Sequence, residues 1–329
     1  MTTMNNSSLL WIERYRPTDL SEIKSQKNII NSIEKFLTNK NLPHLLFFGS
    51  SGTGKTSCIH CACKKLYGDN YRYMILELNA SDNRGIDTVR QQIYEFANTK
   101  SMINDGIKTI ILDEADSMTI MAQNALRKII ENNSDNVRFC IICNYVNKII
   151  PALKSRCIQF RFSPLKEDAK LEILQNILKN EKFNINDEYL KIIIKIANGD
   201  MRRSINMLQS LSIIYRNNKN KITRQDIFDY FNIISDKDFK YIWKVLNNED
   251  NIQNKINTLQ KFILVDNDHN LHELLEHITD KILETNYSNE KKIFLFHELA
   301  KIEEAIIMDY IPELIISSII SIFVKLNSM

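Results

Sequence analysis

The first half of the chain alternates short apolar runs with longer stretches of helical periodicity. Uninterrupted apolar runs are typical of strands in a parallel sheet that is buried on both faces. We therefore predict a doubly covered α/β domain in residues 1–162. Its five expected strands are Leu45–Phe48, Met74–Leu78, Ile107–Leu112, Val137–Cys143 and Ile158–Phe162.

The rest of the chain is helical in pattern. Apolar residues recur at helical spacing, as at Leu190 and Ile193, and Ser163–Leu165 contains a proline suited to a hinge. We expect a small helical lid domain in residues 163–233. An all-helical collar domain is expected in residues 234–329, where apolar helices pack on each other or on sister subunits.

A glycine-rich segment follows the first predicted strand. Residues 49–56 fit the pattern G-x-x-x-x-G-K-[ST], and helical periodicity begins at Ser57. A strand, a glycine turn and a helix N-terminus form a cradle for phosphate. Lys55 is expected to reach the β- and γ-phosphates of ATP, and Thr56 to hold Mg²⁺. An ordinary glycine loop is the weaker alternative. The expected nucleotide-binding residues here are Gly49, Ser50, Ser51, Gly52, Thr53, Gly54, Lys55, Thr56 and Ser57.

A second motif, which is acidic, lies at the end of the third predicted strand. Residues 109–116 run Thr-Ile-Ile-Leu-Asp-Glu-Ala-Asp. Ligands of parallel sheets lie beyond the carboxyl ends of the strands, so Asp113 is expected beside the phosphate loop, holding Mg²⁺ through water. Glu114 is placed to polarise the water that attacks the γ-phosphate. A helix N-cap would explain the acidic residues equally well on their own. Together with Lys55 and Thr56 they predict a Mg-ATP hydrolase.

Three further polar residues are candidates for catalysis. Asn144 ends the fourth predicted strand and could orient the attacking water, although an Asn that caps a turn is an equal alternative. Arg202, at a predicted helix start, could report nucleotide state through the lid. Arg156 precedes the last strand, far from Lys55 in chain order, and could enter a neighbour's site as an arginine finger. A solvated arginine is the alternative for Arg202.

Composition adds little beyond these motifs. The net charge of +3 is too small to establish nucleic-acid binding, so any basic surface must be local. Residues 58–63 contain three cysteines and a histidine, but no second ligand pair at zinc spacing follows. Free cysteines indicate a reducing compartment. Met1–Leu10 lacks a secretory pattern and the apolar run Leu314–Val324 is short for a membrane span, so we expect a soluble, intracellular protein without a membrane partner.

Five motifs in order resemble the small subunits of replication factor C, the eukaryotic sliding-clamp loader and a member of the AAA+ ATPases. They lie in the first two-thirds of the chain, at Trp11–Pro17, residues 49–56, 112–116, 155–157 and 199–203. Residues 79–87 and 149–153 look most like the type of small subunit numbered 5 in animals and 3 in fungi.

The resemblance implies a role for each matching residue. Tyr15, Arg16 and Pro17 belong to the segment that wraps the adenine. Asn144 corresponds to the first sensor, Arg202 to the second, and Arg156 to the finger given to the adjacent subunit. Glu114 is the catalytic carboxylate. The chain departs from the family at Ser50-Ser51, where two prolines are usual, and this lowers the expected stiffness of the loop.

The resemblance also implies partners and a place in the cell. We expect an ATP-hydrolysing subunit of a nuclear heteropentamer, joined to other replication factor C subunits. It would open the sliding clamp, proliferating cell nuclear antigen, and load it onto primer–template DNA in replication and repair. Arg84 and Arg90, at a predicted helix start and its polar face, suit DNA phosphates, although a solvated face remains an alternative.

Two other functions compete with this one. A scaffold that barely hydrolyses ATP and mainly supplies Arg156 would keep the same motifs, although the intact Glu114 argues against it. A helicase-type AAA+ motor would need a DNA-binding module or a pore loop, and the sequence shows neither pattern.

Overall fold

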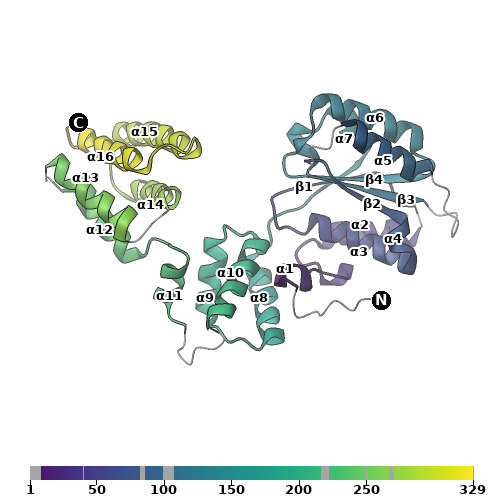
Figure 1. Ribbon diagram of the computed structural model, residues 1–329, viewed down its shortest axis with the longest axis horizontal. Coiled ribbons are helices and arrows are strands. Elements are labelled where there is room, and N and C mark those ends of the chain that lie inside the picture. The colour runs from purple at the N-terminus through teal and green to yellow at the C-terminus, as the bar shows by residue number, and fades with distance from the viewer. Residues whose placement is uncertain are drawn as a thin grey trace. The chain divides into compact units, whose positions relative to one another are not determined.

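The computed structural model describes residues 9–39, 41–81, 86–98, 107–215, 222–248, 251–266 and 270–328. The chain forms two compact units, residues 1–217 and 218–329 (Figure 1). The division lies between Asn217 and Asn218, and the domain bounds predicted at residues 162 and 233 stay predictions.

A five-stranded parallel sheet forms the centre of the first unit. Its order is β2-β3-β4-β1-β5, and all of its neighbouring strands run parallel. The predicted strands are confirmed, with each end within one residue of its expected place. Their bounds are β1 Leu45–Phe48, β2 Ile75–Asn79, β3 Lys108–Asp113, β4 Val137–Cys143 and β5 Ile158–Arg161.

Burial on both faces holds only for the three inner strands. β1, β3 and β4 are almost wholly buried, but Glu77 in β2 and Gln159 in β5 are exposed. The expectation of uniformly buried strands was wrong for β2 and β5. Both are edge strands with a neighbour on one side only, so the layers above and below cover them incompletely.

Helices cover both faces of the sheet (Figure 1). One layer contains α2 Lys27–Thr38, α3 Lys55–Tyr67 and α4 Tyr71–Met74, and the other contains α5 Ile86–Asn98, α6 Ile120–Asn133 and α7 Pro151–Lys154. Side chains of β1 alternate between the layers: Phe47 packs in the core with Ile59 of α3, whereas Leu46 packs in the core with Leu126 of α6. This alternation shows that β1 lies between the two helical layers. The turn that follows β1 therefore also begins between them.

The cysteines belong to these cores. All six are buried and none forms a disulfide. Burial raises the pKa of the Cys58 and Cys63 thiols to about 12, so both remain protonated and unreactive. Among the residues that the structure describes, no group of three or more His, Cys, Asp or Glu side chains could hold a metal ion. The cysteines of α3 therefore act as small apolar packing residues.

Three helices follow the sheet and complete the first unit. They are α8 Glu167–Glu181, α9 Asp187–Ile196 and α10 Met201–Tyr215. The short helix α1 Trp11–Arg14 packs against α10 through the buried Trp11. Short 3-10 turns connect other elements, at η2 Leu20–Glu22, η3 Gly68–Asn70, η4 Ala115–Ser117 and η5 Val146–Lys148.

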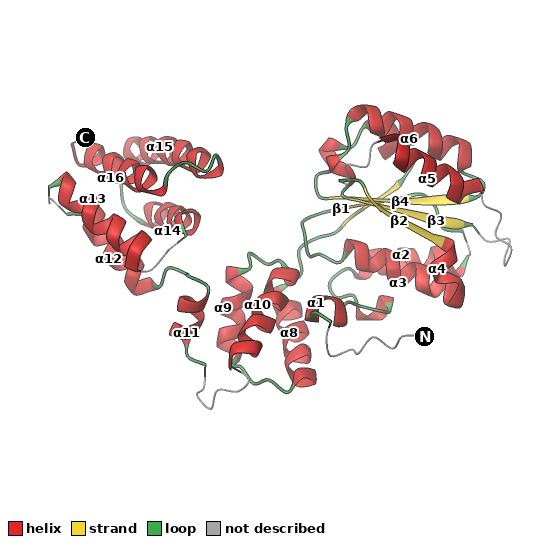
Figure 2. Cartoon of the chain, in the orientation of Figure 1, coloured by secondary structure: helices red, strands yellow, loops and turns green. Residues whose placement is uncertain are grey.

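The second unit is helical throughout its described part (Figure 2). Its helices are α11 Arg224–Tyr230, α12 Asp236–Asn247, α13 Ile252–Gln260, the π-helical η6 Lys261–Asp266, α14 Leu271–Glu284, α15 Asn289–Ile307 and α16 Pro312–Ser328. Leucine and isoleucine side chains from these helices pack around the fully buried Phe323. No helix within the described ranges is both long enough and apolar enough to span a membrane.

Candidate nucleotide-binding site

The phosphate loop is the turn between β1 and α3. Gly49, Gly52 and Gly54 have φ values of 148°, 70° and 92°, a region that L side chains rarely adopt. A Cβ on Gly49 would lie 2.2 Å from the carbonyl oxygen of Phe162. Backbone conformation and space both require glycine here. The helix begins at Lys55, earlier than the predicted Ser57, so the helix N-terminus adjoins the loop directly.

Lys55 is buried at the mouth of this loop, with 7% of its surface exposed. Its ammonium donates to the carbonyl oxygens of Gly49 at 2.7 Å and Ser50 at 2.9 Å, and to Oδ1 of Asn144 at 2.9 Å. Burial lowers the pKa of Lys55, and the nearby Asp113 carboxylate opposes that effect. Because an ammonium has three donors, a phosphate must replace one of these oxygens to bind Lys55.

The two residues expected to hold Mg²⁺ are in direct contact. The hydroxyl of Thr56, in the first turn of α3, donates to Oδ2 of Asp113 at 2.8 Å. Asp113 is the last residue of β3, and its Oδ1 accepts the backbone N–H of Glu114 at 2.9 Å. A hydroxyl and a carboxylate are the hard oxygen donors that Mg²⁺ prefers beside a phosphate. The residues present therefore fit a Mg²⁺ ion.

Glu114 stands where β3 turns out of the sheet. Its φ is 54°, in the left-handed region, and its side chain is exposed. Such a conformation costs about 1–2 kcal/mol for a residue other than glycine, and strained backbone clusters at functional sites. The side chain of Glu114, which follows Asp113 directly in the chain, therefore presents an exposed carboxylate at this turn.

Asp116 has a role that the sequence analysis missed. Its Oδ2 accepts the backbone N–H of Asn144 at 3.2 Å and that of Tyr145 at 3.1 Å. These bonds connect the end of β3 to the end of β4 and fix the turn that carries Asn144. The signal in the sequence was the second aspartate of the Asp-Glu-Ala-Asp run, to which no function was assigned.

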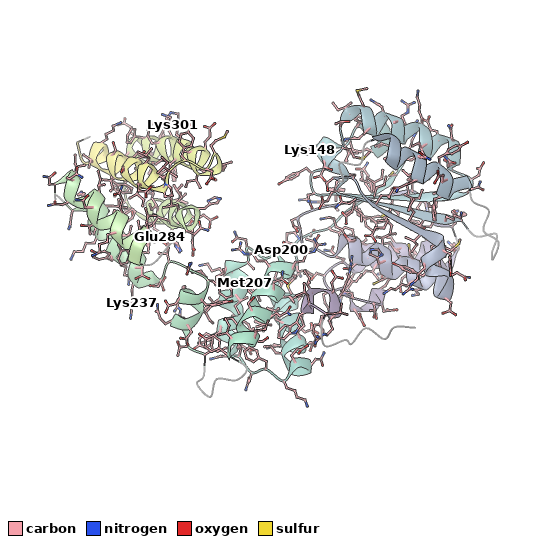
Figure 3. All side chains as sticks on the ribbon, viewed as in Figure 1. Lys148, Asp200, Met207, Lys237, Glu284 and Lys301 are labelled. Carbon is pink, nitrogen blue, oxygen red and sulfur yellow. The ribbon has the colours of Figure 1, made fainter. Side chains whose placement is uncertain are left out.

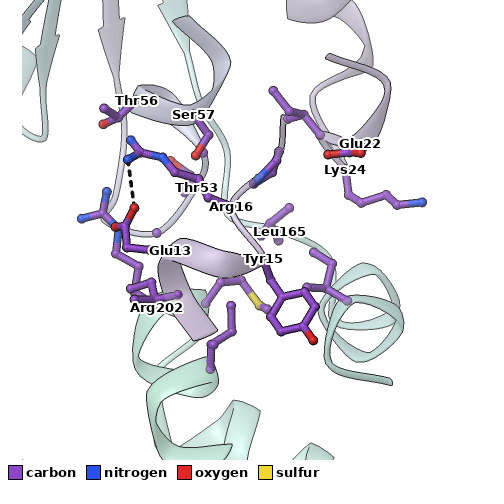
Figure 4. A pocket seen from close by; sticks show the side chains of 18 residues that line it. Glu13, Tyr15, Arg16, Glu22, Lys24, Thr53, Thr56, Ser57, Leu165 and Arg202 are labelled. Carbon is purple, nitrogen blue, oxygen red and sulfur yellow. Dashed lines mark ion pairs between the residues drawn. The ribbon is translucent and has the colours of Figure 1, made fainter. Parts of the chain in front are cut away.

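A cavity of about 400 Å³ lies beside the loop (Figure 4). It is lined by residues from several separate segments, among them Tyr15–Pro17, Gly52–Gly54 and Arg202. Its volume lies within the range of small-molecule sites, and its apolar lining suits a purine. The remaining lining residues are Ile12, Glu13, Glu22, Ile23, Lys24, Thr56, Ser57, Leu165, Ile173, Met201 and Ile205. Tyr15, Arg16, Pro17 and Arg202 therefore line one cavity, and their contact with a nucleotide stays a prediction.

The start of α10 touches the phosphate loop. A Cβ on Gly52 would lie 2.2 Å from Oδ1 of Asp200 and 3.0 Å from the backbone nitrogen of Met201. Asp200 immediately precedes α10 (Figure 3), and its Oδ1 accepts the N–H of Arg202 at 2.8 Å. Asp200 thus connects the loop to the helix that carries Arg202, a contact that the sequence analysis did not anticipate.

Arg156 lies apart from these residues. Its guanidinium donates to the carbonyl oxygen of Ala152 at 2.6 Å and pairs with Glu131 of α6. The same carboxylate oxygen accepts from Nε of Arg127 at 3.0 Å. Arg156 is partly exposed and faces α6 instead of Lys55, so its predicted role in a neighbour's site stays a prediction.

The two DNA-binding candidates cannot be placed as side chains. Arg84 lies outside the described residues. Arg90 lies within α5, and at this position only the backbone is described.

Comparison with known proteins bears on the identity of this site. Residues 45–165 match the family described as "ATPase family associated with various cellular activities", and residues 172–213 match the "RCF1/5-like, AAA+ ATPase lid domain". Replication factor C subunit 3 of Schizosaccharomyces pombe is 41% identical over 91% of this chain and 86% of its own length. The chain belongs to the replication factor C subunit family. Human replication factor C subunit 5 is 38% identical over 96% of this chain and 92% of its own length. These relatives make the chain a AAA+ ATPase of the clamp-loader type.

A solved structure shares the fold at lower identity. The RuvB Holliday junction branch migration motor of Thermotoga maritima has a TM-score of 0.54, covering 77% of this chain and 88% of that chain at 16% identity. This likeness shows the AAA+ fold alone, a parallel sheet followed by a helical lid. The replication factor C relatives, at about 40% identity, separate this chain from such motors.

Proposed function

We propose that this chain binds and hydrolyses Mg-ATP within a nuclear heteropentameric clamp loader, which opens the sliding clamp and loads it onto primer–template DNA. One observation carries the catalytic part of this proposal. Two hydrogen-bonded pairs, Lys55 with Asn144 and Thr56 with Asp113, form one group beyond the carboxyl ends of β1, β3 and β4, because Lys55 and Thr56 are consecutive residues. The group adjoins a cavity of suitable size for a nucleotide.

Each residue of this group has a distinct task in the proposed reaction. Lys55 binds the β- and γ-phosphates by charge-assisted hydrogen bonds. Thr56 and Asp113 would hold Mg²⁺, which neutralises phosphate charge. Asn144 orients the attacking water, and the exposed carboxylate of Glu114 accepts its proton. Arg202 reaches the nucleotide from the lid, and Tyr15, Arg16 and Pro17 enclose the purine.

The remaining assignments extend this proposal beyond the ATP site. The names of the relatives support assembly with other replication factor C subunits. Arg156 is proposed as the finger for the adjacent subunit, because it lies away from Lys55 and is partly exposed. Arg84 and Arg90 are proposed to contact DNA phosphates. We also retain the domain division at residues 162 and 233, with the third domain serving as the collar.

The test replaces Glu114 with Gln in the full assembly. The phosphate-loop lysines of the other subunits are substituted, so that hydrolysis reports on this site alone. We expect unchanged ATP affinity and hydrolysis at least about 100-fold slower, because the amide keeps the shape but cannot accept a proton. Glu188→Gln, an exposed carboxylate on α9, serves as the control. Unchanged hydrolysis with Glu114→Gln would show that Glu114 is not the base. Absence of hydrolysis by the unmodified subunit in this assembly would instead favour a scaffold subunit over a hydrolysing one.

A further inference from the structure

A buried carboxylate in the lid does not line the cavity but is hydrogen-bonded to a residue that does. Glu181 is the last residue of α8, and its side chain is 8% exposed. Its Oε1 accepts a hydrogen bond from the hydroxyl of Tyr15 at 2.8 Å and pairs with the guanidinium of Arg14. Two consecutive residues of the N-terminal segment therefore share one oxygen of the lid.

The position of Glu181 is unfavourable by local rules. A helix C-terminus carries partial negative charge and favours cations, yet α8 ends in this carboxylate. Burial of a carboxylate adds a desolvation cost unless the charge is paired. Arg14 and Tyr15 supply compensating partners. A residue that violates local preferences in this way commonly marks a functional constraint.

Tyr15 connects Glu181 to the cavity. Tyr15, Arg16 and Pro17 line the cavity, while the Tyr15 hydroxyl points away from Thr53 and Ser57 (Figure 4). Burial raises the pKa of Tyr15, and the Glu181 carboxylate raises it further, so the hydroxyl remains a donor. The bond to Glu181 thus fixes the orientation of a ring that forms part of the cavity wall.

A second contact ties the same segment to the lid. The backbone N–H of Trp11 donates to Oε1 of Gln209 on α10 at 2.9 Å, and the Trp11 ring meets the Tyr15 ring edge-on with centroids 6.5 Å apart. The N-terminal segment is therefore held by both α8 and α10. A displacement of these helices must move the wall formed by Tyr15.

We infer that Glu181 is a positioning residue for the purine end of the ATP site, acting through Tyr15. The inference rests on the proposed ATP site. Glu181 orders the wall that encloses the base and couples it to the lid, but it does not contact the phosphates. ATP affinity therefore depends on Glu181, whereas affinity for a triphosphate without a base does not.

The test compares binding of ATP and inorganic tripolyphosphate to the full chain. Glu181→Met keeps the approximate length of the side chain but removes the acceptor, and Tyr15→Phe removes the hydroxyl but keeps the ring. Each variant should weaken ATP binding roughly threefold to tenfold, the change that the net contribution of one hydrogen bond gives. Tripolyphosphate affinity should not change. Glu167→Gln, which removes an exposed carboxylate from the same helix, should bind both ligands like the unmodified chain.

The double variant of Tyr15 and Glu181 separates positioning from general destabilisation. If Glu181 acts through Tyr15, the double variant should bind ATP no more weakly than either single variant. Wild-type ATP affinity in folded Glu181→Met, strictly additive effects, or equal weakening of ATP and tripolyphosphate would each overturn the inference. Failure of the unmodified chain to bind ATP would instead refute the proposed function.

Discussion

Gly52→Ala should disturb both the phosphate loop and the lid, because Gly52 lies where the two touch. Its φ is 70°, and the added methyl group would stand 2.2 Å from Oδ1 of Asp200. The Asp200 side chain must rotate to relieve this overlap. Rotation breaks its bond to the N–H of Arg202, at the start of α10.

The expected cost has two parts. A left-handed conformation costs an alanine about 1–2 kcal/mol. Loss of the side-chain cap at a helix N-terminus adds about 1 kcal/mol. Gly54 provides a matched control in the same loop. Its φ of 92° gives an alanine a similar backbone cost. The nearest atom, in Ile23, would lie 3.9 Å from the added methyl group, so no overlap arises. Gly52→Ala should therefore be about 1 kcal/mol more destabilising than Gly54→Ala.

Thermal unfolding of the full chain measures this difference. For a unit of this size, about 1 kcal/mol corresponds to a shift of roughly 2–4 °C in the Tm of the first unit. The background variant Asp200→Ala removes the carboxylate, so Gly52→Ala should cost about 1 kcal/mol less there than in the unmodified chain. Equal Tm values for Gly52→Ala and Gly54→Ala, or the same cost of Gly52→Ala in both backgrounds, would refute the proposed contact between loop and lid.

Four other experiments test separate features of the molecule. Lys55→Ala should abolish ATP binding in an equilibrium titration, because a charge-assisted phosphate contact is lost; normal affinity would contradict the loop assignment. Arg156→Ala should leave ATP affinity at this chain's own site intact and slow hydrolysis in the adjacent subunit about 10³-fold; the reverse pattern would exclude a role in trans. Arg84→Ala and Arg90→Ala should each weaken DNA binding regardless of sequence and reduce the salt slope by about one. Burial lowers the pKa of His44 to about 4, so the unfolded chain takes up a proton below pH 6.5 while the folded chain does not. Stability should be complete above that pH and fall toward pH 4 in denaturant titrations, a dependence that His44→Gln should reduce.

The local features of this protein were predictable from its sequence. Strand positions follow from uninterrupted apolar runs, and these runs depend only on neighbouring residues. The glycines and Lys55-Thr56 of the phosphate loop form a contiguous motif, so their geometry follows from the adjoining strand and helix. The encounter of Asn144 with Lys55 was also foreseeable, because parallel strands bring their carboxyl ends to one edge of the sheet.

Contacts between distant segments were decided only by the tertiary structure. Edge exposure of β2 and β5 depends on strand order, which no single strand encodes. The pairing of Tyr15 with Glu181 spans 166 residues, and Asp200 meets Gly52 only because the lid folds back onto the loop. Hydrophobic periodicity determines which face of an element is buried, but it carries no information about which distant polar groups will meet there. That choice depends on how the assembled layers bring buried charges and hydrogen-bonding groups to partners, since such groups are costly to leave unpaired.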